Sequence, residues 1–225
     1  MAKYLFKFKK LGLIKYISHL DMIRLFHRAF KRMEISLSYS QGFNPRPKMS
    51  FAQPLSLGFT SLGEYLEFET NKIYNAKDLK DMLNSAMPDG IEITDCWQLD
   101  PKSKSIASIV KWASYEIQCD CEIEPSLVEK FLNQEKIIVL KRQKKKTTMK
   151  EIDIKPMIYE FKTLEDKKGM YAVVRTGSSS NLNPELLLKA FFEYIGKEFR
   201  GENCNIKRLD LFNSEFEPIS SQILT

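Results

Sequence analysis

Cationic and aromatic residues between positions 24 and 48 have the chemistry of nucleic-acid binding. Guanidinium and ammonium groups bind phosphate oxygens, and aromatic rings stack on unpaired bases. The predicted contact residues are Arg24, Arg28, Lys31, Arg32, Phe43, Asn44, Arg46 and Lys48, with Tyr39 as a second aromatic ring. A solvated helix face followed by a structural loop would show the same pattern. The residues therefore leave both interpretations open.

The stretch YSQGFNPRPKMSFAQPLSLG (39–58) contains three prolines and no acidic residue. Gly42 can form a turn, and Pro45 and Pro47 each fix one backbone φ angle. Cations on a stiff support lose less entropy when they bind a phosphate than flexible cations do. We therefore expect the motif GFNPRPK to present its two cations to a ligand.

Candidate catalytic residues are few, because the sequence has two histidines, His19 and His27. A core or capping role is the simpler interpretation of His19. As a general acid or base, His19 could instead cleave RNA without a metal, assisted by Tyr16, Ser40 or Lys48. The histidines are eight residues apart and no CxxC pair accompanies them, so we expect no metal site. The motifs GxxxxGK[ST], GxGxxG and GxSxG are absent from the sequence, and we expect no cofactor.

Other residues are expected to orient the first helix and the loop. These are Tyr16, Ser18, His19, Asp21, Ser40, Gln41 and Gly42. Asp153 and Lys155 in EIDIKP form a secondary candidate set, with outward strand positions as the alternative. The basic run KRQKKKTTMK (141–150) is expected at a hairpin tip or loop, where nucleic-acid contact and simple solvation are both common.

Composition limits the class of protein. The 225 residues are 43% hydrophobic and 12% aromatic, which is enough to build a core. No apolar run approaches the ~20 residues of a membrane span, and charges interrupt the first apolar stretch. Cys96, Cys119, Cys121 and Cys204 fit neither a disulfide framework nor a metal pattern. We therefore expect reduced, buried thiols in a cytoplasmic protein.

Charge is distributed unevenly along the chain. Residues 1–50 hold 11 basic residues (Lys and Arg) and two acidic residues, whereas residues 51–100 hold three basic and nine acidic residues. Residues 101–150 are basic again, with 11 basic and six acidic residues. Two basic blocks separated by an acidic block predict an oriented field with two places where a polyanion could dock.

Hydrophobic periodicity predicts the elements that position the first set of residues. In the first half we expect strands at 3–10, 35–40, around 48–53, 63–70 and 90–99, and helices at 18–33 and 75–88. Ser18 and Asn75 are the predicted N-caps. The apolar arc of the first helix contains Leu20, Met22, Ile23, Phe26, Ala29, Phe30 and Met33.

The second half repeats this order of elements. We expect strands at 110–123, 136–143, 151–165, 170–177 and 205–213, and helices at 125–134 and 183–199. The order predicts an α+β fold, a tandem of two ferredoxin-like (split βαβ) domains. The predicted domains are 1–100 and 107–213, followed by a loosely held tail at 214–225.

The segments YISHLDMIRLFHRAFKR and YSQGFNPRPKMSFAQPLSLGFTSLGEYLEFE resemble the radical-SAM-linked protein family, a bacterial domain of unknown function. Its members occur alone or C-terminal to cobalamin-binding and radical SAM domains. The resemblance is dense from Tyr16 to Glu69 and looser at EIDIKPMI and SSSNLNPELLLKAF. This chain departs from the family pattern at Arg46, where a histidine is usual, at Lys155, where an arginine is usual, and in the turn SSNLNPE.

The resemblance implies association with radical SAM chemistry on RNA. The chain lacks the CxxxCxxC spacing that holds the iron–sulfur cluster of radical SAM enzymes. The first hypothesis is therefore an RNA-binding or substrate-presenting accessory protein, inactive alone, that acts with a radical SAM enzyme on tRNA or rRNA. The second is a metal-free ribonuclease using His19, and the third is an adaptor for an acidic protein partner.

Overall fold

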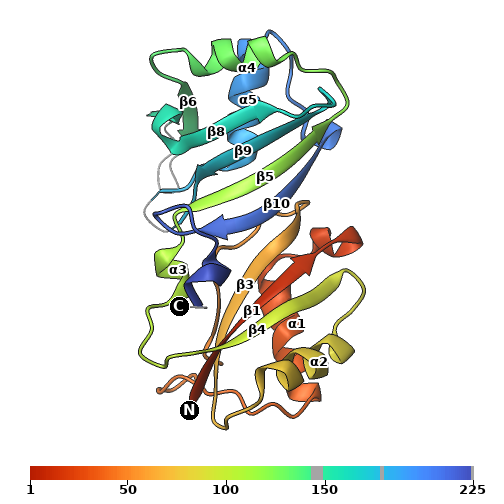
Figure 1. Cartoon of the computed structure of the whole chain (residues 1–225), viewed down its shortest axis with the longest axis vertical. Coiled ribbons are helices and arrows are strands. Elements are labelled where there is room, and N and C mark those ends of the chain that lie inside the picture. Colours follow the sequence, from red (N-terminus) through yellow and green to blue (C-terminus); the bar gives the residue numbers. More distant parts are fainter. Residues whose placement is uncertain (143–148, 178–179, 224–225) are drawn as a thin grey trace. The chain divides into compact units, whose positions relative to one another are not determined.

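The computed structural model describes residues 1–142, 149–177 and 180–223, and these residues form a mixed α+β protein (Figure 1). The chain divides into two compact units. The first consists of the described residues of Met1–Lys111 and Arg208–Thr225, and the second of those of Trp112–Lys207. The predicted α+β class is confirmed. The units differ from the predicted domains because the chain from Arg208 onward belongs to the first unit.

The sheet of the first unit is built around its N-terminal strand. Strand β1 (Ala2–Lys10) lies between β4 (Ile91–Leu99) and β3 (Thr60–Thr70), antiparallel to both. The short strand β2 (Met49–Phe51) pairs with β3, also antiparallel. The last residues of β10 (Cys204–Phe212) follow β3 in the strand order. Residues 3–10 thus form a strand, as the sequence predicts, and this strand is central and buried over most of its length.

Two helices, α1 (His19–Arg32) and α2 (Ala76–Ala86), cover one face of this sheet (Figure 1). Their apolar sides meet aromatic residues of β1 and β3 in one core, where the rings of Phe6 and Phe30 stack at 6.3 Å and those of Phe30 and Phe68 lie at 4.8 Å. Both helices begin at the predicted N-caps, Ser18 and Asn75. The short 3-10 helix η1 (Gly12–Tyr16) connects β1 to α1.

The second unit contains strands β5 (Trp112–Cys119), β9 (Gly169–Arg175) and β8 (Ile158–Thr163) and its own helices. Strand β5 lies between the first residues of β10 and β9, and β8 follows β9. Helices α4 (Pro125–Leu132) and α5 (Pro184–Tyr194) pack on this sheet through Phe131, Phe161 and Phe191. Strands β6 (Ile138–Arg142) and β7 (Met149–Asp153) form a separate two-stranded sheet.

Short helices complete the structure. These are α3 (Ile106–Ile109), η2 (Lys155–Met157), η3 (Gly201–Asn203) and η4 (Ile219–Ile223). Within the described part of the chain, no helix is both long enough and apolar enough to cross a membrane.

Two predictions about strands need correction. Residues 35–40 form no regular strand, because they make only isolated bridges at Leu37 and Tyr39. The segment predicted as one strand at 151–165 is divided by η2, since its first part pairs with residues 138–142 as a hairpin. Periodicity detects extended backbone, but it does not say which partner that backbone will find.

The predictions for Leu20 and for the C-terminal tail are also wrong. Leu20 is 63% exposed, because it lies in the first turn of α1 at the margin of the apolar arc. The described part of the tail is held in place: Pro218 bridges to Phe212, and Ile219 is completely buried. The side chain of Asn213 accepts hydrogen bonds from the backbone N–H groups of Glu215 and Glu217, which closes the intervening turn.

Candidate functional site

The first turn of α1 sets the position of Arg24, one of the residues predicted to bind phosphate. The Ser18 hydroxyl accepts a hydrogen bond from the Asp21 backbone N–H at 3.1 Å and donates one to the Asp21 carboxylate at 2.7 Å. The same carboxylate pairs with the Arg24 guanidinium at 2.9 Å. The Ser18 hydrogen bond and then the Arg24 contact hold the pKa of Asp21 below its ordinary value. Ser18 and Asp21 thus hold Arg24 at the first turn of α1.

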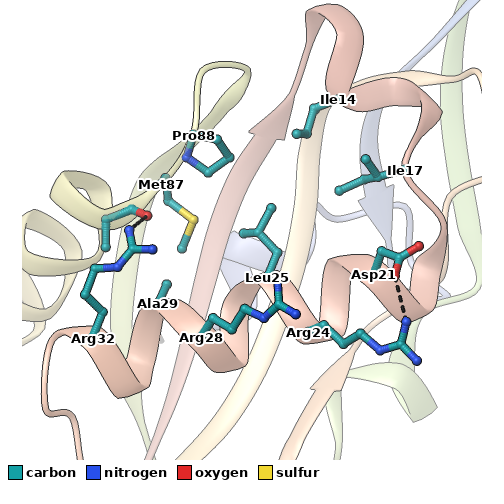
Figure 2. Close-up of a pocket in the computed structure, with 11 residues that line it drawn as sticks. Ile14, Ile17, Asp21, Arg24, Leu25, Arg28, Ala29, Arg32, Met87 and Pro88 are labelled. Atoms are coloured by element: carbon teal, nitrogen blue, oxygen red, sulfur yellow. Dashed lines mark hydrogen bonds and ion pairs between the residues drawn. The ribbon is translucent and has the colours of Figure 1, made fainter.

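Three arginines line one wall of a pocket of ≈ 450 Å³ beside α1 (Figure 2). Arg24, Arg28 and Arg32 follow one another at intervals of four residues, so each lies about 6 Å further along the helix axis. Leu25 and Ala29 form the apolar floor next to them. The opposite side consists of apolar side chains from two connections, namely Ile14, Ile17, Met87 and Pro88.

A glycine turn brings the two connections of this pocket together. Gly90 has φ 92°, a conformation that favours glycine, and its carbonyl accepts a hydrogen bond of 2.8 Å from the Leu11 N–H. A Cβ at Gly90 would meet the Leu11 carbonyl oxygen at 2.4 Å. The turn after α2 can therefore approach η1 closely enough to close the apolar wall.

The three arginines differ in how their guanidinium groups are engaged. Arg24 pairs with Asp21, and both side chains are more than half exposed. Arg32 donates a hydrogen bond of 3.3 Å to the carbonyl of Ala86, at the C-terminal end of α2. Arg28 has no ion-pair partner among the described residues. The pocket therefore combines an accessible cation with apolar surface, whereas Lys31 lies on the exposed side of α1 and does not line it.

The proline-rich loop forms a closed tip. The Ser40 N–H donates to the Arg46 carbonyl at 2.9 Å, and the Arg46 N–H donates to the Ser40 hydroxyl at 3.0 Å. Gly42 takes φ 123° within the turn. Residues 41–46 are all exposed, and Phe43 at the tip is fully exposed. The structure thus presents an aromatic ring, Asn44 and the Arg46 guanidinium to solvent on a braced loop.

The loop is joined to α1 at its base, and one of its cations is already paired. The Tyr39 hydroxyl shares a hydrogen bond of 3.1 Å with Nε2 of His27. Lys48 pairs with the Glu69 carboxylate at 2.7 Å. A phosphate at Lys48 must therefore displace the Glu69 carboxylate or share the ammonium group with it. The loop residues do not line the arginine pocket, so the predicted contact residues lie in two neighbouring regions rather than in one.

His19 lies at a second, smaller cavity of ≈ 20 Å³ lined also by Lys10, Ser18, Phe51 and Glu64. The imidazole contacts the Phe51 ring edge-on at 5.3 Å and remains exposed on its other side. Partial burial and then the nearby Lys10 charge lower the pKa of His19, so the imidazole is neutral at pH 7. Neither Tyr16 nor Ser40 nor Lys48, the predicted assistants, is among the described residues that line this cavity.

The site geometry lies within a region that matches a known protein family. Residues 3–184 match the family described as an uncharacterized protein conserved in bacteria (DUF2344). The chain belongs to this family. The match includes α1, the proline-rich loop and the secondary candidates, whereas Arg208 and Cys204 lie beyond it.

Other comparisons gave distant likenesses. No curated protein matches the chain. A chain of the structure titled "Crystal Structure of a Cbf5-Nop10-Gar1 Complex" is similar with a TM-score of 0.47 and 8% identity, over 92% of this chain and 48% of that chain. This chain thus spans about half the length of the chain that it matches in that complex. The structure titled "Dye-decolorizing protein from V. cholerae" has a TM-score of 0.20 and 10% identity, over 92% and 91% of the two chains.

The secondary candidates, Asp153 and Lys155, belong to the second unit and have local structural roles. The Asp153 carboxylate accepts hydrogen bonds of 3.0 Å from the N–H groups of Ile137 and Lys155. The Lys155 ammonium donates to the Gln134 carbonyl. These bonds fix the end of the β6–β7 hairpin. The central part of the predicted basic run 141–150, residues 143–148, lies outside the described residues.

Sequence reasoning missed a buried ionic cluster behind the His19 cavity. Arg208 and Glu64 are 2% and 4% exposed, and their side chains approach to 3.3 Å. Arg208 also donates to the carbonyls of Gln53 at 2.9 Å and Pro54 at 3.2 Å, which anchors the chain after β2. Burial raises the pKa of Glu64 despite this cation, and burial lowers the pKa of Lys10. The sequence did contain a signal that Glu64 is buried, because Glu64 shares its strand face with Leu66 and Phe68, which are both buried.

Within the part of the chain that the structure describes, no group of three or more His, Cys, Asp or Glu side chains is arranged to hold a metal ion.

Proposed function

We propose that this protein is an RNA-binding or substrate-presenting accessory protein. The observation that carries the proposal is the row of Arg24, Arg28 and Arg32 along α1, facing an apolar wall across one pocket. Guanidinium groups bind phosphate oxygens, and an apolar wall can receive the face of an unstacked base. Unpaired RNA offers both groups together, whereas the stacked bases of a duplex are not accessible in this way.

The spacing of the arginines supports an extended ligand. The Cα atom of each arginine lies about 6 Å further along the axis of α1 than that of the arginine before it. A flexible single strand can place successive phosphates along such a row. Asp21 pairs with the first arginine, and its charge also acts more weakly on Arg28. The exposed Asp21–Arg24 pair can open when a phosphate arrives, since exposed ion pairs contribute little stability.

The proline-rich loop supports the same ligand from a second side. Phe43 is fully exposed at the loop tip, with Asn44 and Arg46 beside it. An aromatic ring that packs against nothing in the protein suits stacking on a base. Backbone bonds at Ser40 and Arg46 brace the loop, so less entropy is lost when it binds. We propose that the loop stacks on one nucleotide while α1 holds phosphates.

We also propose that both units are ferredoxin-like. In the first unit, the order β4-β1-β3-β2 with antiparallel neighbours supports the split βαβ arrangement. In the second, the order β10-β5-β9-β8 supports the same arrangement, with β6 and β7 as an inserted hairpin. The repeated order supports a duplication of one architecture, although fold alone assigns no function.

The proposed partner, a radical SAM enzyme acting on tRNA or rRNA, rests on the sequence resemblance at residues 16–69. The chain would bind and present the RNA, and the partner would supply the radical chemistry. This part of the proposal is tested by copurification of the two proteins with and without RNA. If RNA binding holds and no such enzyme copurifies, the accessory role is wrong while the binding role stands.

Binding to bulk cellular RNA across a salt series tests the proposal, with Arg28→Ala and the double variant Arg24→Ala/Arg28→Ala beside the wild type. Each lost phosphate contact is expected to reduce the slope of log affinity against log salt by about one unit or slightly less. Arg200→Ala is the matched control, because Arg200 is an exposed arginine of the second unit paired with Glu198. No binding at low salt, or equal slopes for all four proteins, would exclude this site and direct the search to acidic protein partners.

A metal-free ribonuclease is the second candidate, favoured by the His19 cavity. A neutral imidazole beside the Lys10 ammonium suits a general base that deprotonates a ribose hydroxyl. The variant His19→Ala separates the two candidates. Lost RNA cleavage with retained RNA binding supports the ribonuclease, and absence of cleavage by the wild type excludes it.

A further inference from the structure

Three of the four cysteines gather at one end of the second unit. Cys119 ends β5, Cys121 follows two residues later, and Cys204 begins β10. The backbones of the two strands meet here, because the Asp120 N–H donates to the Asn203 carbonyl at 3.1 Å. The Sγ atoms of Cys119 and Cys204 lie 2.6 Å apart. The sequence predicted reduced, buried thiols with no pairing pattern, whereas the fold places Cys119 and Cys204 in direct contact across 85 residues.

A small reagent can reach this pair. A pocket of ≈ 190 Å³ is lined by all three thiols together with Lys197, Arg200 and Phe199. Cys119 is buried, but Cys204 and Cys121 are partly exposed. The same pocket also contains the acidic side chains of Asp120 and Glu198, and Glu198 pairs with Arg200 at 2.8 Å. A partly exposed thiolate is the reactive form of cysteine.

The two contacting thiols are not equivalent. Sharing one proton between the sulfurs lowers the pKa of Cys204 and raises the pKa of Cys119. The buried Cys119 thiol is therefore the hydrogen-bond donor of the pair, and Cys204 is the sulfur that loses its proton more readily. Cys96, in the first unit, is the opposite case, because burial raises its pKa to about 12.

We propose that Cys204 and Cys119 form a dithiol site oxidised by hydrogen peroxide. The Cys204 thiolate attacks one peroxide oxygen and the O–O bond breaks, which gives Cys204 sulfenic acid and, after proton uptake, water. The Cys119 sulfur then attacks the sulfenic sulfur, the S–O bond breaks, and the Cys119 proton leaves with the hydroxyl group as a second water. Two thiols are thus oxidised to one disulfide while one peroxide is reduced to two waters.

The disulfide would close a ring that includes nearly all of the second unit, from the end of β5 to the start of β10. Large rings restrict the unfolded chain most, so the oxidised protein is expected to melt about 5–15 °C higher than the reduced protein. This site is independent of the proposed RNA interface, since the pocket lies in the second unit and α1 lies in the first. Its test therefore succeeds or fails separately.

The test is peroxide treatment of the full chain, alkylation of the remaining thiols, and peptide mapping without reductant. We expect a peptide pair linked through Cys119 and Cys204, a mass lower by two hydrogens, and full reversal by dithiothreitol. Cys119→Ser should stop at the sulfenic acid, trapped at Cys204 by a 1,3-diketone. Cys121→Ser is the matched control and should form the linked pair like the wild type.

Three results would overturn the proposal. One is a wild-type protein whose Cys204 is alkylated as fast after peroxide treatment as before it. Another is a disulfide that joins Cys121 instead of Cys119 to Cys204. The third is Cys96 reacting as fast as Cys204. Mapping of the wild type alone decides among these outcomes, so a variant that fails to fold does not weaken the test.

Discussion

The imidazole Nε2 of His27 and the hydroxyl oxygen of Tyr39 lie 3.1 Å apart and share a hydrogen bond. Their rings meet edge-on, with centroids 6.5 Å apart. Tyr39 also forms a backbone bridge with Pro47, so the base of the proline-rich loop is closed where it meets α1. This contact links the loop that presents Phe43 to the helix that carries the arginines.

Tyr39→Phe should therefore weaken RNA binding without unfolding the protein. The variant keeps the ring and loses one partly exposed hydrogen bond, which changes the unfolding free energy by about 1 kcal/mol or less. A less firmly held loop should lower RNA affinity by about 2- to 5-fold, measured by fluorescence anisotropy. Tyr194→Phe, at an exposed tyrosine of the second unit, is the control. An equal effect of both variants would contradict the proposed role of the contact.

Phe43→Ala should affect RNA affinity and leave stability unchanged. Phe43 is fully exposed, so its removal costs no packing and should shift the unfolding free energy by less than about 0.5 kcal/mol. Loss of one stacked base should weaken binding of single-stranded RNA by about 1–3 kcal/mol. Phe43→Trp should retain binding, and Ile73→Ala, at another exposed apolar residue, should behave like the wild type. If Phe43→Ala binds RNA with the affinity of the wild type, the Phe43 ring does not stack on a base.

The elements that carry this site could be predicted from the sequence because their determinants are local. The Ser18 cap, the arginine spacing and the apolar arc of α1 all lie within sixteen residues, and the structure reproduces them, apart from Leu20. Proline and glycine mark the exposed loop in the same way. Local sequence was thus sufficient for the helix and the loop, but not for the pocket between α1 and the turn after α2.

The rest depends on contacts between distant residues. Arg208 meets Glu64 across 144 residues, and Cys204 meets Cys119 across 85. Whether a charged residue on a strand is buried with a partner depends on the neighbouring strand, which periodicity does not identify. The same reason explains why residues 35–40 were predicted as a strand and form only isolated bridges.

His19 should titrate below the ordinary histidine value of 6.5. Burial is the larger cause and the Lys10 charge the smaller, and both disfavour the imidazolium. The unfolded chain therefore binds this proton more readily, so His19 lowers stability as the pH falls through 6.5. NMR titration of the imidazole measures the midpoint. Lys10→Met should move the midpoint upward but leave it below 6.5, and a midpoint at or above 6.5 in the wild type would refute this assignment.

Ile219→Ala should destabilise the first unit, although Ile219 lies in a segment whose sequence has little pattern. Its side chain is completely buried, and truncation of such a residue costs about 2–5 kcal/mol through lost burial and the cavity left behind. Urea unfolding measures the change, with Ile73→Ala as the exposed control. A loss of less than about 0.5 kcal/mol would show that the described tail contributes nothing to the core.

Arg208→Met should be the most destabilising of these variants at neutral pH. It leaves Glu64 buried without its cation and two carbonyls, at Gln53 and Pro54, without their donor. Removal of one partner from a buried ion pair costs about 3–5 kcal/mol. Urea unfolding at pH 7 measures this loss. Lys207→Met, at the neighbouring but partly exposed pair with Glu116, should cost about 1 kcal/mol or less.

The loss at Arg208 should become smaller in acid. Burial already raises the pKa of Glu64 above its ordinary value of 4.5, and loss of the Arg208 charge raises this pKa further. The folded variant then holds a proton that the unfolded chain releases as the pH rises above 4.5, so its stability falls with rising pH. As the pH is lowered toward 4.5, Glu64 takes up its proton in the folded variant before it does so in the unfolded chain, so the contribution of charge to the loss shrinks. The lost hydrogen bonds to the two carbonyls then account for a growing share of the remaining difference. An equal loss at pH 5 and pH 7 would mean that Arg208 acts through packing and hydrogen bonds alone, and not through its charge.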